Sequence, residues 1–185
     1  PVRADPAAAS PRERAVLAEA LRRSRRCDEA LAVLGDPTDA SGLLVRASCL
    51  QADGRFDESV ADLRTVLARE PGTRGVRTAL GRALLGQGRP DEAAAVLRQE
   101  LALGADPEAV ELLGLTLASQ RRHVESVRVL SRAHERGVEL SWTGYAVWAE
   151  AARQCGKPWR GARDLAARAG APPGVIQVLE KEPVR

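Results

Sequence analysis

The side chains in this sequence that could perform chemistry are two histidines, three cysteines and several adjacent acidic residues. His123 and His134 lie 11 residues apart, which is about three turns of one predicted helix. They cannot bind one metal ion together without other ligands, and no cysteine lies close to them. This spacing argues against a metal site.

The three cysteines, Cys27, Cys49 and Cys155, are odd in number and far apart, and they form no C-x-x-C pair. Such a pattern is typical of small core residues in a reducing compartment and not of a disulfide framework. A catalytic thiol needs a base within hydrogen-bond reach, and Cys155 has no histidine close to it in the sequence. We therefore predict no catalytic cysteine.

Adjacent acidic residues recur along the chain and resemble the paired carboxylates of acid–base catalysts: Asp28-Glu29, Asp57-Glu58 and Asp91-Glu92. Each pair falls in the first turn of a predicted helix, where acids interact favourably with the helix dipole, so we interpret them as structural. Gly86-x-Gly88 has no strand before it and no G-K-[ST] after it, so it predicts an interhelical turn and not a phosphate loop. The sequence therefore predicts no enzyme, no metal site and no cofactor.

The composition predicts which elements must carry these side chains. The 185 residues are 44% hydrophobic, rich in Ala, Leu, Arg and Glu, and only 3% aromatic, which favours an all-α protein with an aliphatic core. The net charge of +3 is weaker than that of a dedicated nucleic-acid binder, and we predict no transmembrane segment. Because the sequence begins with Pro and lacks Met, we interpret it as a processed fragment. We expect a cytoplasmic location and leave a periplasmic or secreted parent open.

An internal period organises the chain. The stretch GRFDE begins at Gly54, and GRPDE begins 34 residues later at Gly88. Alignment to this period gives three columns that recur in five copies. The first column is small: Ala18, Ala47, Gly81, Gly114 and Ala149. The second is also small: Ala30, Ser59, Ala93, Ser126 and Gly161. The third is leucine: Leu34, Leu63, Leu97, Leu130 and Leu165. Facing small residues let paired helices approach closely, so the columns predict buried hairpin contacts.

With these landmarks, residues 11–182 resemble the tetratricopeptide repeat family, whose unit is a helix–turn–helix of 34 residues. The resemblance implies an all-α, right-handed superhelical array of helical hairpins, and a helical-hairpin array of another family is the alternative. The repeats are predicted at about 11–39, 40–73, 74–106, 107–141 and 142–173, with a capping helix at 174–182 and a disordered segment or linker at 1–10.

Local signals predict where the helices begin and reverse. Ser10 and Glu13 form a capping box, and Asp106 and Ser141 are further candidate caps. The turn glycines Gly54, Gly88 and Gly156 are predicted to be left-handed, and Arg121 stands where another such glycine is expected.

The resemblance further implies that the first helices of the repeats line a concave groove that binds a protein partner. The groove candidates are Arg22, Arg23, Leu44, Ser48, Gln51, Thr78, Arg82, Leu85, Glu111, Leu115, Glu150 and Arg153. The alternative is that these residues form a solvated face, with Arg22 and Arg23 paired to acids of their own array.

The groove candidates combine arginines with leucines, so we predict a partner peptide or helix with acidic and apolar side chains. The chain lacks Asn and has no Lys before residue 157, so the carboxylate clamp of one family subgroup does not carry over, although an Arg-based variant stays open. A secretion or assembly chaperone is a subclass of this function. A nucleic-acid-binding array is the alternative: it is favoured by six Arg within residues 11–27, but Glu108, Glu111 and Glu150 interrupt any basic track.

Four of the five aromatic residues lie in the last repeat. Tyr145 and Trp148 are predicted to be buried, whereas Trp142 and Trp159 fall at helix starts, where burial is harder. We predict that Trp142 and Trp159 are exposed and contact a neighbouring domain or partner, because exposed Trp is favoured at interfaces. The alternative is that both pack under the helix at 174–182. The oligomeric state is not predicted.

Overall fold

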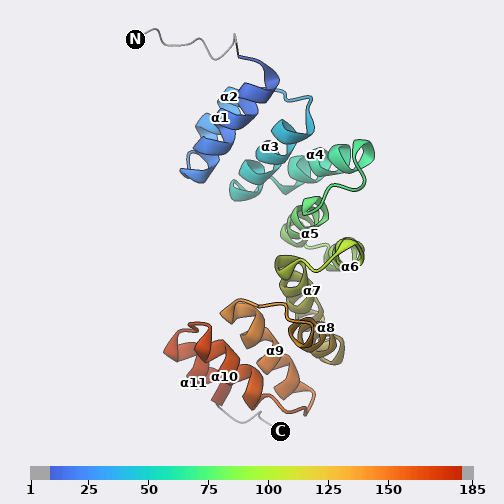
Figure 1. Cartoon of the computed structure of the whole chain (residues 1–185), viewed down its shortest axis with the longest axis vertical. Helices are drawn as coiled ribbons and strands as arrows, with labels where there is room; N and C mark the ends of the chain where they lie inside the picture. Colours follow the sequence, from blue (N-terminus) through green and yellow to red (C-terminus); the bar gives the residue numbers. More distant parts are fainter. Residues whose placement is uncertain (1–8, 181–185) are drawn as a thin grey trace. The chain divides into compact units, whose positions relative to one another are not determined.

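The computed structural model describes residues 9–180, and all of the regular secondary structure in this range is helical (Figure 1). The helices are α1 (Pro11–Arg23), α2 (Cys27–Leu34), α3 (Ala40–Ala52), α4 (Phe56–Arg69), α5 (Val76–Gly86), α6 (Pro90–Leu103), α7 (Pro107–Ser119), α8 (His123–Glu135), α9 (Trp142–Gln154), α10 (Arg160–Arg168) and α11 (Pro173–Glu180). This is the predicted all-α array of hairpins with a C-terminal helix. None of the described helices is both long and apolar enough to cross a membrane.

The chain forms two compact units, residues 1–89 with α1–α5 and residues 90–185 with α6–α11. Within them, consecutive helices pack in pairs: α1 on α2, α3 on α4, α7 on α8 and α9 on α10, and α11 lies beside α9 and α10 (Figure 1). Most of the predicted segment 1–10 and the end of the predicted capping helix lie outside the described residues. Ser10, however, is ordered as the N-cap of α1.

The three predicted caps are confirmed, and each explains where its helix begins. The Ser10 hydroxyl accepts a bond from the Glu13 N–H at 3.3 Å, and the Glu13 carboxylate accepts one from the Ser10 N–H at 2.8 Å. Asp106 accepts from the Glu108 N–H at 3.0 Å, and Ser141 accepts from the Gly144 N–H at 3.3 Å. Each bond satisfies an N–H group that has no partner within its helix.

The hairpin turns share one backbone geometry. Gly54, Gly88 and Gly156 have φ values of +74°, +70° and +68°, as predicted for left-handed turn residues. Arg25 and Arg121 hold the same turn position with φ values of 59° and 60°. A side chain in this region costs about 1–2 kcal/mol, which the helix packing must offset in these two turns.

The motif GRFDE contains the turn and the start of α4, which is the second helix of its repeat. Gly54 makes the turn, Arg55 is the N-cap residue, and the Arg55 guanidinium donates two bonds of 2.7 and 2.6 Å to Glu58 in the first turn. These bonds lower the pKa of Glu58. The same fork joins Arg26 to Glu29 and Arg122 to Glu125. The acidic residues of the motif therefore hold the turn in place, as a structural role predicts.

Hairpin α7–α8 shows why the three columns recur. Leu130 side-chain atoms lie 2.7–2.8 Å from the point where Gly114 would carry a Cβ, so any larger residue would collide with the leucine. The buried Ser126 hydroxyl donates to the Gly114 carbonyl at 2.8 Å. One residue from each column meets at this contact, and the small residues allow the two helices to approach closely.

The predicted burial of the columns is confirmed in the first four repeats, including Gly81, Ala93 and Leu97, and Leu97 is 0% exposed. In the last repeat the prediction is wrong by one residue. Gly161 is exposed and Leu165 half-buried, whereas Ala162 and Ala166 are buried in their place.

A longer turn causes this shift. Helix α10 begins at Arg160, four residues after the turn glycine Gly156, whereas α4 begins at Phe56, two residues after Gly54. The later helix start is accompanied by a shift of the buried positions by one residue.

Candidate binding surfaces

The first helices of the repeats line two hollows, one in each unit. The α1/α3 hollow, in residues 1–89, has a volume of about 670 Å³ and is lined by Arg12, Ala15, Val16, Glu19, Ala20, Arg23, Ser41 and Val45. The α7/α9/α11 hollow, in residues 90–185, has a volume of about 600 Å³ and is lined by Leu115, Ala118, Ala146, Val147, Glu150, Gly174, Val175, Val178 and Leu179.

The α7/α9/α11 hollow is almost entirely aliphatic. Leu115 on α7 and Val178 on α11 are 48% and 57% exposed, although both are large apolar side chains. Between them lie small residues of α9, which leave the hollow open. Burying apolar surface of this kind against a partner removes it from water, which favours binding.

One ion pair borders the α7/α9/α11 hollow. The Arg153 guanidinium donates bonds of 2.9 and 2.7 Å to the Glu150 carboxylate, and the Gln154 amide donates one of 2.6 Å. The bonds from Arg153 are the main reason that the pKa of Glu150 is lowered. Glu150 is therefore ionised at neutral pH, with its charge balanced by a neighbour on its own helix.

The α1/α3 hollow has a charged lining. Arg22 donates bonds of 2.7 and 2.8 Å to Glu19, and Arg23 donates one of 2.8 Å. The bonds from Arg22 are the largest cause that lowers the pKa of Glu19 to about 2. Arg22 and Arg23 therefore pair with an acid of their own array, which was the alternative to a partner-binding role. Val16, which is 67% exposed, adds an apolar side chain to the same hollow.

Comparison with known proteins identifies the repeat. Residues 50–116 match the family model of the tetratricopeptide repeat. This segment is tetratricopeptide repeat sequence. No curated protein sequence matches it.

Several solved structures have a similar fold. A thermophilic TPR protein of Thermus thermophilus is 19% identical with a TM-score of 0.68, over 91% of this chain and 96% of that one. MamA is 17% identical with a TM-score of 0.66, over 92% and 91% of the two chains. PilF of Pseudomonas aeruginosa is 18% identical with a TM-score of 0.75, over 91% and 80%. At these identities the likeness shows the fold alone.

The structure brings together two of the predicted groove residues, Leu115 and Glu150, in the α7/α9/α11 hollow. It adds Val175, Val178 and Leu179 of α11, which the sequence had suggested only as a capping helix. Their apolar spacing was visible in the sequence, but the side of α11 that faces the repeats depends on how it packs on α9. In residues 1–89, Arg23 and Glu19 line the other hollow.

Other predicted groove residues of the repeats are engaged inside the molecule. The Gln51 amide donates to the Ser59 hydroxyl at 3.0 Å and to the Ala79 carbonyl at 3.2 Å, so Gln51 joins α3 and α4 to α5. Thr78 is 2% exposed, so the prediction that it meets a partner is corrected. The Ser48 hydroxyl donates to the Leu44 carbonyl at 2.9 Å, within its own helix.

The remaining groove candidates differ in their exposure. Glu111 accepts bonds from the backbone and hydroxyl of Ser141, and it thereby holds the start of α9 against α7. Leu44 and Leu85 are half-buried, and Arg82 is exposed on α5. The position of a residue on a first helix is therefore not enough to make it available to a partner.

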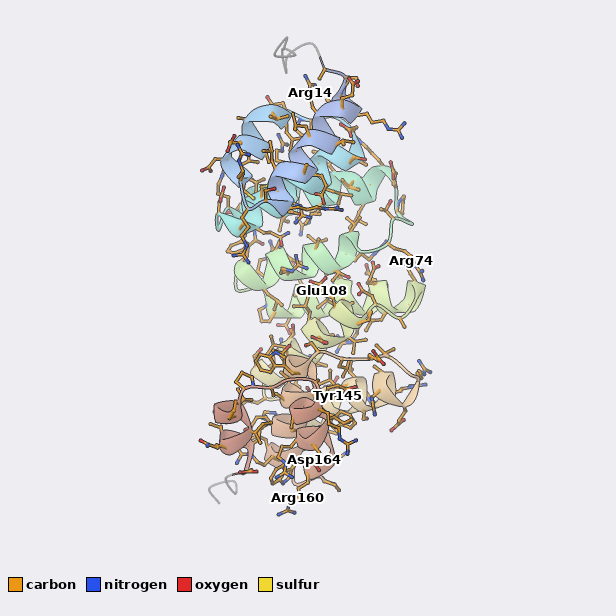
Figure 2. All side chains as sticks on the ribbon, turned by 60° about the vertical axis from the view of Figure 1, so that its left-hand side comes forward. Arg14, Arg74, Glu108, Tyr145, Arg160 and Asp164 are labelled. Atoms are coloured by element: carbon orange, nitrogen blue, oxygen red, sulfur yellow. The ribbon has the colours of Figure 1, made fainter. Side chains whose placement is uncertain are left out.

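The aromatic residues of the last predicted repeat differ partly from prediction. Tyr145 is buried as predicted, and its hydroxyl lies 3.1 Å from His134 Nδ1. Trp148 is only half-buried, not buried as predicted. In Figure 2, Tyr145 lies among the helices, whereas Arg160 points outward.

Trp142 and Trp159 are half-buried and not exposed as predicted. Trp159 packs on Val127 and Ala152, and the guanidinium carbons of Arg160 and Arg163 lie 5.1 and 5.7 Å from its ring centre. Packing against α8 and α9 thus covers part of Trp159, and Trp148 is the tryptophan that contacts α11 residues. An interface role for Trp142 and Trp159 stays a prediction.

The histidines lie near the two ends of α8. Among residues 9–180, no group of three or more His, Cys, Asp or Glu side chains is arranged to hold a metal ion.

Proposed function

We propose that this chain is a non-catalytic interaction module that binds a helix or peptide of a partner protein on its first helices. Tetratricopeptide repeat proteins typically mediate protein–protein interactions, and the repeat array supplies the surface for this. The observation that supports the proposal best is the α7/α9/α11 hollow, where Leu115 and Val178 remain 48% and 57% exposed beside small residues.

The chemistry of this hollow favours an apolar partner segment. Its lining is aliphatic, and the carboxylate of Glu150 is already bonded to Arg153. A partner helix could insert leucine- or valine-sized side chains at spacings of three and four residues, as in other helix-in-groove complexes. The acidic partner side chains predicted from Arg22 and Arg23 receive less support, because both arginines bond to Glu19.

The test is to capture a partner with the full chain and then to measure its affinity for variants. Leu115→Ser should weaken binding at least about tenfold, since it removes a large apolar contact from the centre of the hollow. Val124→Ser is the matched control, because Val124 is also apolar and 55% exposed but lies on the second helix α8. Equal losses for both variants, or none for Leu115→Ser, would exclude the hollow as the binding surface.

A titration with random RNA and DNA at two salt concentrations tests the nucleic-acid alternative. Binding that weakens steeply with salt and is insensitive to Leu115→Ser would favour that alternative over a protein partner.

A further inference from the structure

Two of the three cysteines meet in the core that joins the first two repeats. Cys49 on α3 is 0% exposed and belongs to a cluster with Ala18, Ala30 and Val45. Cys27, the first residue of α2, is half-buried and packs on the same cluster. The same cluster includes Leu34 and the half-buried Leu21 and Leu31, and α2 packs on α3 here.

The repeat geometry places Cys27 of α2 against the end of α3. The first residue of a second helix packs on the last turns of the following first helix. In the next repeat, the Phe56 ring of α4 fills the space where Gly86 of α5 lacks a side chain. Cys27 holds the position of Phe56, since each lies two residues after its turn residue. Ala52 of α3 holds the position of Gly86, and Cys49 lies about one turn before Ala52, in the cluster on which Cys27 packs.

The surroundings give the two thiols different reactivity. The pKa of Cys49 is raised to about 12, mainly by burial and next by a hydrogen bond with the Cys27 thiol, while the Arg22 charge opposes the shift. Cys49 is shielded from solvent, so it does not react first with a dissolved oxidant. Cys27 is half-buried, so it is the sulfur that a small oxidant can reach, and it packs on the cluster that contains Cys49.

We propose that Cys27 and Cys49 are a redox pair that forms a reversible disulfide between α2 and α3. With a peroxide as oxidant, the Cys27 sulfur attacks the O–O bond, gains one oxygen as a sulfenic acid and releases water. The Cys49 sulfur then attacks the Cys27 sulfur. The S–S bond forms, the S–O bond breaks, and the leaving hydroxide takes the Cys49 proton as water. Each thiol gives up one electron and one proton in total, and a dithiol reductant reverses the change.

The disulfide would join the first hairpin to the helix that lines one of the two hollows. Ser41 and Val45 of α3 line the α1/α3 hollow together with residues of α1. A covalent bond between α2 and α3 closes a chain loop and restricts the unfolded state. Oxidation would therefore stabilise residues 1–89. This stabilisation does not depend on which partner binds.

The experiment treats the full chain, folded, with hydrogen peroxide and digests it with trypsin without reduction. We expect residues 27–46 to be recovered linked to residues 47–55, and the link to disappear on adding dithiothreitol. The thermal unfolding midpoint should rise by roughly 5–10 °C, as expected for a loop of this length in a chain of this size.

Variants separate the pair from the third cysteine. Cys49→Ala should remove the link and still fold, because the equivalent positions in other repeats are Ala83 and Ala151. Cys27→Ser should also remove it, whereas Cys155→Ser should leave it unchanged. The proposal is overturned if the two peptides stay separate after oxidation, whether Cys27 is unmodified or converted to a sulfinic acid. A link that joins only two different molecules also overturns it.

Discussion

The same repeat position carries Glu19 in the α1/α3 hollow and Leu115 in the α7/α9/α11 hollow. Each residue directly follows the buried small residue of its first helix, Ala18 or Gly114. Glu19 bonds to two arginines of its own helix, whereas Leu115 is 48% exposed beside alanines and valines. The repeat therefore sets where this residue points but not which chemistry it presents.

This comparison separates two kinds of position in the repeat. The small and leucine columns must interlock with the facing helix, so their residue types are narrowly limited. The position after the small column faces away from that contact and is free to be charged or apolar. One framework can therefore hold a polar surface in residues 1–89 and an apolar one in residues 90–185.

The largest expected effect is the loss of stability when a buried leucine is truncated. It tests whether residues 1–89 and 90–185 share the same packing of small and leucine columns. Leu63→Ala and Leu97→Ala should each lower the free energy of unfolding by about 2–4 kcal/mol, because both leucines are fully buried and leave a cavity. Urea unfolding measures both. Leu103→Ala, at a residue that is 45% exposed, is the control and should cost much less. A cost for only one of the two buried leucines would mean that the halves are packed differently.

The next effect concerns a charge pair in residues 1–89. Arg46 donates bonds of 2.8 and 2.7 Å to Asp62, which is 7% exposed between α3 and α4. Asp62→Asn should lower the free energy of unfolding by about 1–3 kcal/mol, because Arg46 loses its buried counter-charge and keeps only the exposed Asp36.

Thermal or urea unfolding measures this loss. Glu58→Gln, which breaks the solvent-exposed fork with Arg55, is the control and should change stability little. Similar effects for the two variants would show that the Arg46–Asp62 pair is as accessible to water as the surface fork.

A smaller effect is expected on how the free energy of unfolding depends on pH, and it comes from Glu19 in the α1/α3 hollow. The pKa of Glu19 is lowered from 4.5 to about 2, so its bonds to Arg22 and Arg23 stabilise the folded chain above pH 4.5. This contribution is lost as the pH falls through about 2. It should amount to less than about 1 kcal/mol, since water still reaches these side chains.

The measurement compares the unfolding free energy of the wild type with that of Glu19→Gln across this range. The difference should be largest at neutral pH and should vanish in acid. A difference that does not change with pH would mean that the Glu19 carboxylate acts by shape and not by charge.

The smallest effect compares one turn from each half. Arg25→Gly and Arg121→Gly should each raise the free energy of unfolding by up to about 1 kcal/mol, because the left-handed cost of about 1–2 kcal/mol exceeds the added flexibility of glycine. Gly88→Ala should have the opposite sign, since Gly88 has a φ of +70°. Thermal unfolding of the three variants checks this, and a loss of stability in both arginine variants would contradict it.

Much of the fold was predictable because helix packing leaves a periodic mark in the sequence. Ala18, Ala93 and Leu97 recur at fixed offsets since each must fit the same close contact. The last repeat was misaligned because the turn before α10 is longer, and a shift of one residue in the core positions leaves no trace in the period itself. The pairing of Glu19 with Arg22 and Arg23 was readable from their spacing of three and four residues on one helix.

The sequence by itself determined the helices, the turns and the residues that join paired helices, because these depend on neighbours within one repeat. Only the tertiary structure decided which side chains meet from different repeats. The contact of Cys27 with the core around Cys49, and the apolar hollow between Leu115 and Val178, both depend on how one hairpin lies on the next. Such contacts are set by the sum of many packing interactions across an interface, and no short stretch of sequence records that sum.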